Sequence, residues 1–366
     1  MNNGRWQKKF AGFGISLLNS VLPVLLAFVI GGVIILLLGE NPFETYAIML
    51  EKSLFTAKGF AYTLHKASPL ILTGLAIAVT FKANIFNMGV EGQFLLGGFF
   101  AGIIGTALPT ASPVLLKLAC LAAGILCGVG FALIPAFLKA YFHVNEMVVT
   151  LMLNYAMVKI LEFLSTGVFR DLGSGYVATP TIPEAAMFTR IGNSKLTFFF
   201  FIALFVFVII YFVMLHSRLG YEITAIGKNP EFAEAVGVKV YRKIIVISGA
   251  LAGLGGAGHM LSDQYKYTLS FSGTPGLGWD GMLVALLGGH HPVGVLGASI
   301  LYSALKTGSD NINFYTDVPK EIVAVIQSLI ILFLAVRFLS EKTGKREAKK
   351  KPGNELTAKT AEGEVL

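Results

Sequence analysis

Residues 84–108 read NIFNMGVEGQFLLGGFFAGIIGTAL, and this stretch decides the class of fold. Its first part carries the polar residues Asn87, Glu91 and Gln93, and the part that follows is almost wholly apolar. A helix that crosses the hydrocarbon of a bilayer needs about 20 mostly apolar residues. The stretch therefore predicts a membrane-spanning helix over 91–108, with polar groups at its start.

The composition of the whole chain agrees with a protein that lies in lipid. Of 366 residues, 55% are hydrophobic and only 14% are charged, and the mean hydropathy is +0.71. A soluble domain needs far more charge on its surface. The apolar runs predict about ten spans, at 17–38, 69–81, 91–108, 114–138, 146–165, 196–216, 244–262, 280–290, 292–308 and 321–339. We therefore expect an all-α integral membrane protein.

The second and eighth runs are short, which leaves open whether they are full or broken helices. The first run is too long for the core of a cleaved secretory signal, so it is expected to stay as a helix.

The basic residues predict how the chain lies in the membrane. If both termini are cytoplasmic, the cytoplasmic segments hold roughly twice as many Lys and Arg residues as the outer ones. This topology explains the net charge of +8 better than binding to nucleic acid does. We expect a cytoplasmic N-terminus over 1–16, a transmembrane domain over 17–340, and a disordered cytoplasmic tail over 341–366.

Four polar side chains interrupt apolar sequence in or next to the predicted spans and indicate a polar pathway, namely Asn87, Glu91, Gln93 and Asn154. A carboxylate at the centre of a spanning helix costs about 2.5 to 3.5 kcal/mol, so Glu91 needs compensation. Either it faces a polar pathway, or it lies at the cytoplasmic interface and caps the helix that follows. Asn87 and Gln93 are expected to approach the pathway. For Asn154, a hydrogen bond between helices and a contact with the solute both remain open.

The longest internal polar stretch, 217–243, is predicted to lie in the cytoplasm and to contain a short helix. The residues assigned to it are Asn229, Pro230, Glu231, Phe232, Ala235 and Gly237. The asparagine suits the N-cap, the proline the first turn, and the glutamate the positive end of the helix dipole. The glycine would end the helix. The helix would expose its Phe and Ala to a partner protein, although the stretch by itself reads more simply as a connecting loop.

Other polar residues are given structural roles. Asp280 is expected to cap a helix at the interface, beside Trp279 as an aromatic anchor. His290 and His291 precede a proline and are read as a tight turn. The aromatic cluster at 198–207 is typical of a helix surface that faces lipid.

Small residues four positions apart predict close contacts between helices. The pairs are Gly98 with Gly102, Gly124 with Gly128, and Gly249 with Gly253. Without side chains at these positions, two helix backbones can approach each other closely. Cys120 and Cys127 are read as small packing residues of the same bundle.

Motifs of hydrolytic enzymes are absent from the sequence. It contains no G-x-x-x-x-G-K-[ST] phosphate loop, no H-E-x-x-H and no G-x-S-x-G. The chain is therefore not expected to be an enzyme or to hold a cofactor or metal. The energy for any transport must come from a partner.

Five blocks resemble the permease subunits of ATP-binding-cassette importers for simple sugars and nucleosides, the branch that shares the membrane fold of the vitamin B12 importer. The blocks are NPFETY at 41–46, SPLILTGLAIAVTFKANIFNMGVEGQFLLGG at 68–98, NEMVVTLMLNY at 145–155, AIGKNPEFAEAVGV at 225–238, and GWDGMLVALLGGHHPVGVLGASILYSALKTG at 278–308. The resemblance covers about residues 10–340.

The long segment before the second span and the LTGLAIAV run are most similar to the longer permease of nucleoside importers. The resemblance implies a bacterial plasma-membrane protein with a second, shorter permease, an ATPase with two fused cassettes, and a substrate-binding lipoprotein as partners. It implies that the ATPase hydrolyses ATP and that nucleosides cross by alternating access. It matches 229–237 to the cytoplasmic coupling helix. It also matches Asn87, Gly89, Glu91, Gly92 and Gln93 to a signature of the central helices.

Two alternatives remain at this point. One is the same type of importer for a simple sugar such as ribose. The other is an ion-coupled secondary transporter, which would use Glu91, Glu162 and Asp280 as buried acids.

Overall fold

The computed structural model describes residues 25–333, except 109, 143, 239–240, 274–275, 317–318, 320, 327 and 330–331. The predicted N-terminal segment 1–16, the first part of the span at 17–38 and the tail at 341–366 lie outside the described residues. So does the last part of the span predicted at 321–339.

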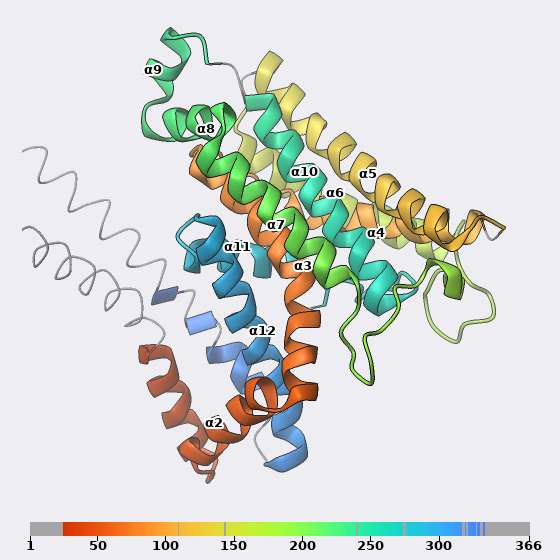
Figure 1. Ribbon diagram of the computed structural model, residues 1–366, viewed down its shortest axis with the longest axis vertical. Helices are drawn as coiled ribbons and strands as arrows, with labels where there is room; N and C mark the ends of the chain where they lie inside the picture. The colour runs from red at the N-terminus through yellow and green to blue at the C-terminus, as the bar shows by residue number, and fades with distance from the viewer. Residues whose placement is uncertain are drawn as a thin grey trace, which may run out of the picture. The chain divides into compact units, whose positions relative to one another are not determined.

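The regular structure of the described residues is helical, apart from two isolated β-bridges (Figure 1). A helix at Leu25–Leu37 is followed by α2 (Pro42–Leu50), η1 (Glu51–Phe55), α3 (Ala57–Lys82), α4 (Val90–Ala107), α5 (Pro113–Phe142), α6 (Glu146–Thr166), η2 (Glu184–Ala186), α7 (Phe199–His216), α8 (Arg218–Lys228), α9 (Pro230–Ala235), α10 (Tyr241–His259), η3 (Met260–Gln264), α11 (Leu277–Leu287) and α12 (Pro292–Tyr315). The all-α prediction is confirmed for this part of the chain.

Six of the described helices are long and apolar enough to cross a membrane. They are α3, α4, α5, α6, α7, and α10 together with its π-helical end η3. The predicted number of ten spans is therefore not confirmed. The predicted eighth span is the 11-residue α11, which is too short to cross a bilayer alone.

The second predicted span is a full-length helix, because α3 begins well before the apolar run. His65 and Lys66, whose polar side chains bounded that run, lie inside α3. His65 Nε2 lies 3.3 Å from Asp263 Oδ1, and Lys66 Nζ donates to Asp310 Oδ2. Partners far along the chain bind both side chains, and the helix continues through them.

Residues Met49–Asn311 form one compact unit, and α10 lies at its centre. α10 packs against α3, α4 and α5. Gly249 and Gly253 of α10 face Gly124 and Gly128 of α5, and a Cβ atom added to Gly253 would lie 2.1 Å from the Gly124 carbonyl oxygen. The close contact predicted from the glycine spacing is confirmed for these two helices.

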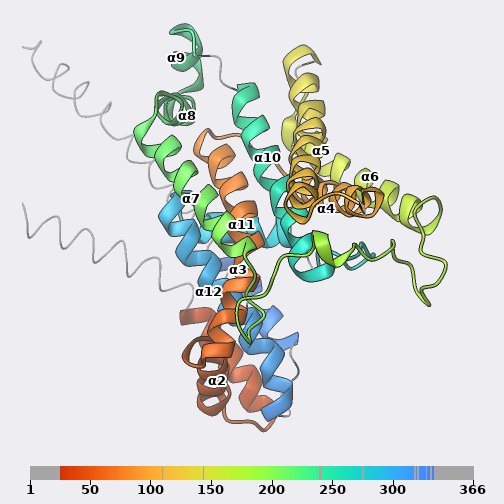
Figure 2. The ribbon, with the colours of Figure 1, turned by 45° about the vertical axis from the view of Figure 1, so that its right-hand side comes forward.

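The two ends of this unit differ. α8 and α9 lie at the end where α7 finishes and α10 begins (Figure 2). The segment between α6 and α7 lies at the other end, where it covers the end of α10. There Thr179 N donates to Tyr267 O at 3.0 Å, and Ile182 N donates to Tyr265 O at 2.9 Å. The unit therefore has an α9 end and an opposite end.

A second unit comprises residues up to Ile48 and from Ile312 onward. Within it, Tyr46 OH donates to Phe28 O at 2.8 Å, which ties α2 to the helix before it. A Cβ atom on Gly31 would lie 2.4 Å from Ile326, so that glycine permits close packing in this unit.

Candidate functional site

The turn that leads into α4 is held by two side chains of α6. Thr150 Oγ1 accepts a hydrogen bond from Met88 N at 3.1 Å. Asn154 Oδ1 accepts from Gly92 N at 2.8 Å, and its Nδ2 donates to Met88 O. A Cβ atom at position 92 would lie 2.8 Å from Asn154 Oδ1, so only glycine leaves room for this contact. Of the two roles left open for Asn154, the structure shows the hydrogen bond between segments of the bundle.

Asn87 and Gln93 lie side by side in the interior, one on each side of the start of α4. Asn87 Nδ2 donates to Ser248 Oγ of α10 at 2.9 Å, and its Oδ1 accepts from Gly89 N at 3.0 Å. Gln93 is fully buried, and its Oε1 receives only a long contact, 3.5 Å, from Asn87 Nδ2. Its Nε2 has no hydrogen-bond partner among the residues that the structure describes. A buried amide left in this way is destabilising unless a ligand or water can bind it.

Glu91 connects α4 to the start of α11. Its carboxylate is buried, and Oε2 accepts a hydrogen bond from Gly278 N at 2.6 Å. The positive end of the α11 dipole therefore faces this carboxylate. Gly276 has a φ of 126°, and a Cβ atom there would lie 2.7 Å from the carboxylate, so glycine is required for this approach. Glu91 lies in the first turn of α4, and its hydrogen bond with Gly278 N caps the start of α11.

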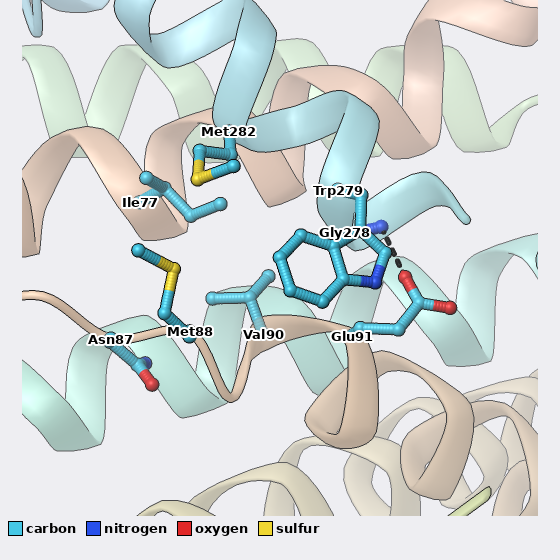
Figure 3. Close-up of a pocket in the computed structure, with 8 residues that line it drawn as sticks. All are labelled: Ile77, Asn87, Met88, Val90, Glu91, Gly278, Trp279 and Met282. Atoms are coloured by element: carbon cyan, nitrogen blue, oxygen red, sulfur yellow. Dashed lines mark hydrogen bonds between the residues drawn. The ribbon is translucent and has the colours of Figure 1, made fainter. Parts of the chain in front are cut away.

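A small cavity lies where these groups meet (Figure 3). It is lined by Ile77, Asn87, Met88, Val90, Glu91, Gly278, Trp279 and Met282. Its volume is about 10 Å³, which is room for about one water molecule. The four pathway residues predicted from the sequence are thus brought together around the start of α4. The wall that they form is closed to anything as large as a sugar in this conformation.

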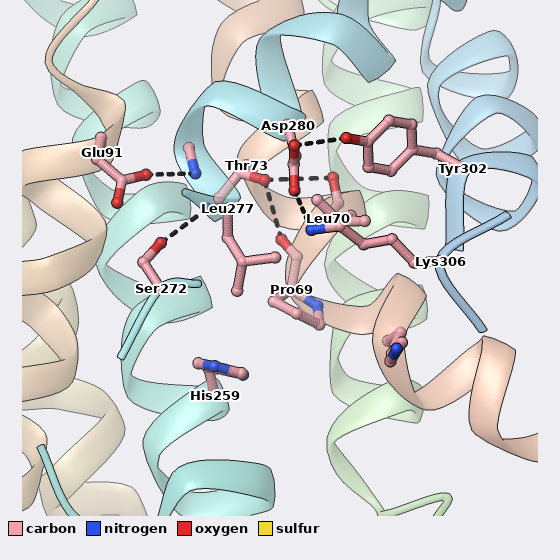
Figure 4. A network of polar contacts seen from close by, with 12 residues as sticks. Pro69, Leu70, Thr73, Glu91, His259, Ser272, Leu277, Asp280, Tyr302 and Lys306 are labelled. Atoms are coloured by element: carbon pink, nitrogen blue, oxygen red, sulfur yellow. Dashed lines mark hydrogen bonds and ion pairs between the residues drawn. The ribbon is translucent and has the colours of Figure 1, made fainter. Parts of the chain in front are cut away.

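A second polar cluster joins α11 to α12 (Figure 4). Asp280 is fully buried, and it accepts hydrogen bonds from Tyr302 OH at 2.6 Å and from Lys306 Nζ at 2.5 Å. The interpretation of Asp280 as an interfacial cap is therefore wrong. A carboxylate buried this deeply requires a cation, and α12 supplies one.

The predicted short helix of the segment 217–243 is present as α9. Asn229 Oδ1 accepts a hydrogen bond from Phe232 N at 3.0 Å, and Pro230 occupies the first turn. Gly237 follows the helix with a φ of 80°, a conformation that favours glycine. Phe232 is 62% exposed, and Glu231 and Ala235 are exposed as well. α9 therefore presents an apolar ring beside a carboxylate at one end of the molecule.

Comparison with known proteins gives the chain a family. A family described as the permease component of the branched-chain amino acid transport system matches residues 59–335. The chain belongs to this permease family.

Individual relatives match over nearly their whole length. The nucleoside ABC transporter permease protein NupB of Lactococcus lactis is 33% identical over 88% of this chain and 91% of its own length. The guanosine ABC transporter permease protein NupP of Bacillus subtilis is 33% identical, over 91% and 98%. The glucose ABC transporter permease protein TsgB13 of Haloferax volcanii is 32% identical, over 86% of each. With its apolar helices, this permease is a multi-pass membrane protein.

Sequence reasoning missed several residues that hold the permease together. Ser248, Thr150, Tyr302 and Lys306 each bind one of the polar groups described above. A signal for one of them was present, because a Lys within an apolar helix normally pairs with a buried acid. Lys306 was therefore a natural partner for Asp280. Serine, threonine and tyrosine carry no such signal, since they occur in helices for many other reasons.

Proposed function

We propose that this permease is the transmembrane subunit of an ATP-binding-cassette importer, and that nucleosides cross it by alternating access. The similarity to NupB and NupP over about nine-tenths of the chain carries this proposal. The match to TsgB13, whose name states glucose, supports a simple sugar such as ribose as the second candidate.

Transport by purified protein tests the substrate. The permease is reconstituted in proteoliposomes with its partner proteins, and uptake of labelled guanosine, adenosine, uridine and ribose is measured with ATP inside. Nucleoside uptake should exceed ribose uptake by at least about tenfold, which corresponds to roughly 1.4 kcal/mol of discrimination. Ribose uptake above nucleoside uptake would favour the sugar candidate.

Ionophores for protons and sodium separate this mechanism from an ion-coupled one. Nucleoside uptake by the importer should continue in their presence and stop without ATP.

Two acids that an ion-coupled mechanism would use are bound to other groups in this structure. Asp280 pairs with Lys306, and Glu162 Oε2 lies 2.8 Å from Lys159 Nζ. This binding of the acids supports the ATP-driven mechanism.

Coupling to the ATPase is assigned to α9 with the residues that flank it, so that Asn229 to Gly237 form the docking element. The exposed Phe232, with Glu231 and Ala235 beside it, offers a surface that a cytoplasmic partner could cover. On this assignment the α9 end of the molecule is cytoplasmic, as are both termini. The membrane is the bacterial plasma membrane.

The remaining partners are a second, shorter permease and an extracytoplasmic substrate-binding lipoprotein. We place the second permease against the exposed face of α6. Lys159 on this apolar helix is 78% exposed and pairs with Glu162. A charge pair facing lipid is unfavourable, so a protein surface or an aqueous path is the better neighbour.

The path for the solute runs past the start of α4, where Asn87, Glu91, Gln93 and Asn154 meet. The wall is closed in the conformation described, so α4, α6 and α11 must separate to admit a nucleoside. Gln93 is assigned the contact with the solute, because its Nε2 is a buried donor without a partner among the described residues. Glu91 and Asn154 hold α11 and the turn before α4 in place.

Replacing Gln93 by leucine should lower nucleoside uptake about tenfold, because a hydrogen bond worth about 1.4 kcal/mol is lost. The thermal stability of the complex should stay the same or rise, because the variant removes a buried amide donor without a partner among the described residues. Asn154→Leu provides the contrast, since it leaves Gly92 N and Met88 O unpaired and should lower stability by about 1–3 kcal/mol. Uptake and thermal unfolding are measured for both variants. Unchanged uptake by Gln93→Leu would remove Gln93 from the path.

A further inference from the structure

A surface hollow of about 420 Å³ lies between the start of α5 and the start of α7. Its lining is aromatic and aliphatic apart from one threonine and one lysine, and consists of Lys117, Phe188, Thr189, Phe198, Phe201, Ile202 and Phe205. α7 leads from this hollow towards α8, so the hollow lies at the end of the molecule opposite α9. It is separate from the path at the start of α4.

The cation in this hollow lacks a counter-ion. Lys117 lies in an apolar run of α5 and is half-buried. Throughout the described residues, no carboxylate lies within ion-pair distance of its ammonium group. The next basic residue along the lining segment, Arg190, is exposed and adds positive charge. A half-buried ammonium at the end of a spanning helix is favourable only if an anion or water reaches it.

The apolar part of the hollow follows the start of α7, a candidate membrane span. Phe198, Phe201 and Phe205 are each at least half exposed and lie on one face at the start of α7. Phe201 and Phe205 are separated by about 6 Å along the helix axis, because each residue rises about 1.5 Å. α7 is the most apolar of the six candidate spans. A ligand that fits must therefore be charged at one end and apolar along its length.

We infer that the hollow between α5 and α7 binds an anionic phospholipid. Its phosphate accepts hydrogen bonds from Lys117 Nζ, and an acyl chain lies along Phe201 and Phe205. The charge selects an anionic lipid over a zwitterionic one, because only the anionic headgroup carries a net negative charge that can balance the ammonium of Lys117. With α9 on the cytoplasmic side, the lipid belongs to the outer leaflet. This leaflet assignment alone rests on the proposed function.

Native mass spectrometry of the complete complex tests the site with two named probes, dioleoylphosphatidylglycerol and dioleoylphosphatidylethanolamine. Wild-type protein should retain the phosphatidylglycerol preferentially. Lys117→Gln should reduce its retention about fivefold, since one lysine near a membrane surface contributes about that factor. Lys58→Gln is the matched control, because Lys58 is an exposed lysine at the same end of the bundle. That variant should retain lipid as the wild type does.

A second variant tests the apolar part. Phe205→Ala should weaken retention of both lipids while the preference for phosphatidylglycerol remains. The inference is overturned if Lys117→Gln retains as much phosphatidylglycerol as Lys58→Gln does. Equal retention of the two lipids by wild-type protein would overturn it as well. Nucleoside uptake measured in parallel is independent of either result, so failure of the lipid site leaves the proposed transport untouched.

Discussion

Replacing Asp280 by asparagine should destabilise the folded permease by about 3–5 kcal/mol, because it leaves the ammonium of Lys306 in the interior without a carboxylate. Lys306→Met should have a similar effect, since it leaves a fully buried carboxylate beside Tyr302 alone. The double variant Asp280→Asn with Lys306→Met removes both charges and should recover much of the stability. The yield of folded complex after size-exclusion chromatography and its thermal unfolding in detergent give the measurement.

The exposed pair Arg218–Glu222 on α8 serves as the control for this experiment. Arg218→Gln removes a contact of the same type, 3.0 Å from Glu222, at a position that is 92% exposed. That variant should lose less than about 1 kcal/mol. A loss for Asp280→Asn as small as this one would contradict the buried ion pair. A double variant as unstable as the sum of the two single variants would show that the charges do not depend on each other.

Replacing Ala235 by tryptophan, or Glu231 by lysine, should reduce ATP-driven nucleoside uptake at least about tenfold, which corresponds to roughly 1.4 kcal/mol of lost coupling. Both positions are exposed on α9, so the helix can accept the new side chains while its docking surface is changed. The permease should stay folded, and ATP hydrolysis by the complex should no longer respond to the substrate. Uptake and ATP hydrolysis in proteoliposomes are measured side by side.

Conservative variants at the same positions are the matched controls. Ala235→Ser and Glu231→Gln preserve the size of each side chain and should keep uptake within about twofold of the wild type. Asn229→Ala removes the N-cap bond to Phe232 N and should weaken α9 by about 1 kcal/mol, with an intermediate loss of uptake. Normal uptake by Ala235→Trp and Glu231→Lys would show that α9 is not the docking element.

Elements that depend only on residues close together in the sequence were predicted well. The cap, first turn and end of α9 depend on residues within a few positions of one another. The glycine pairs of α5 and α10 could be predicted for the same reason, because their spacing places both members on one helix face. The apolar runs predicted most of the long helices, since length and hydropathy suffice for a span.

Predictions that depended on distant partners were incomplete. The charged boundary before Pro69 was read as the end of an apolar run, although α3 continues through it. For Glu91, a polar pathway and a cap on the adjacent helix were both left open, and the structure shows that it binds Gly278 far along the chain. In both cases the sequence shows that a polar group needs compensation and does not show which residue provides it.

The sequence by itself therefore determined that this chain is an all-α membrane protein with polar residues placed in its spans and a capped helix between α7 and α10. Only the tertiary structure decided that Asp280 pairs with Lys306, that Glu91 faces the start of α11, and that Gln93 retains a donor without a partner among the described residues. The reason is physical. Helix formation and burial follow from local composition, whereas the partner of a buried charge is chosen by the packing of helices that are far apart in the chain.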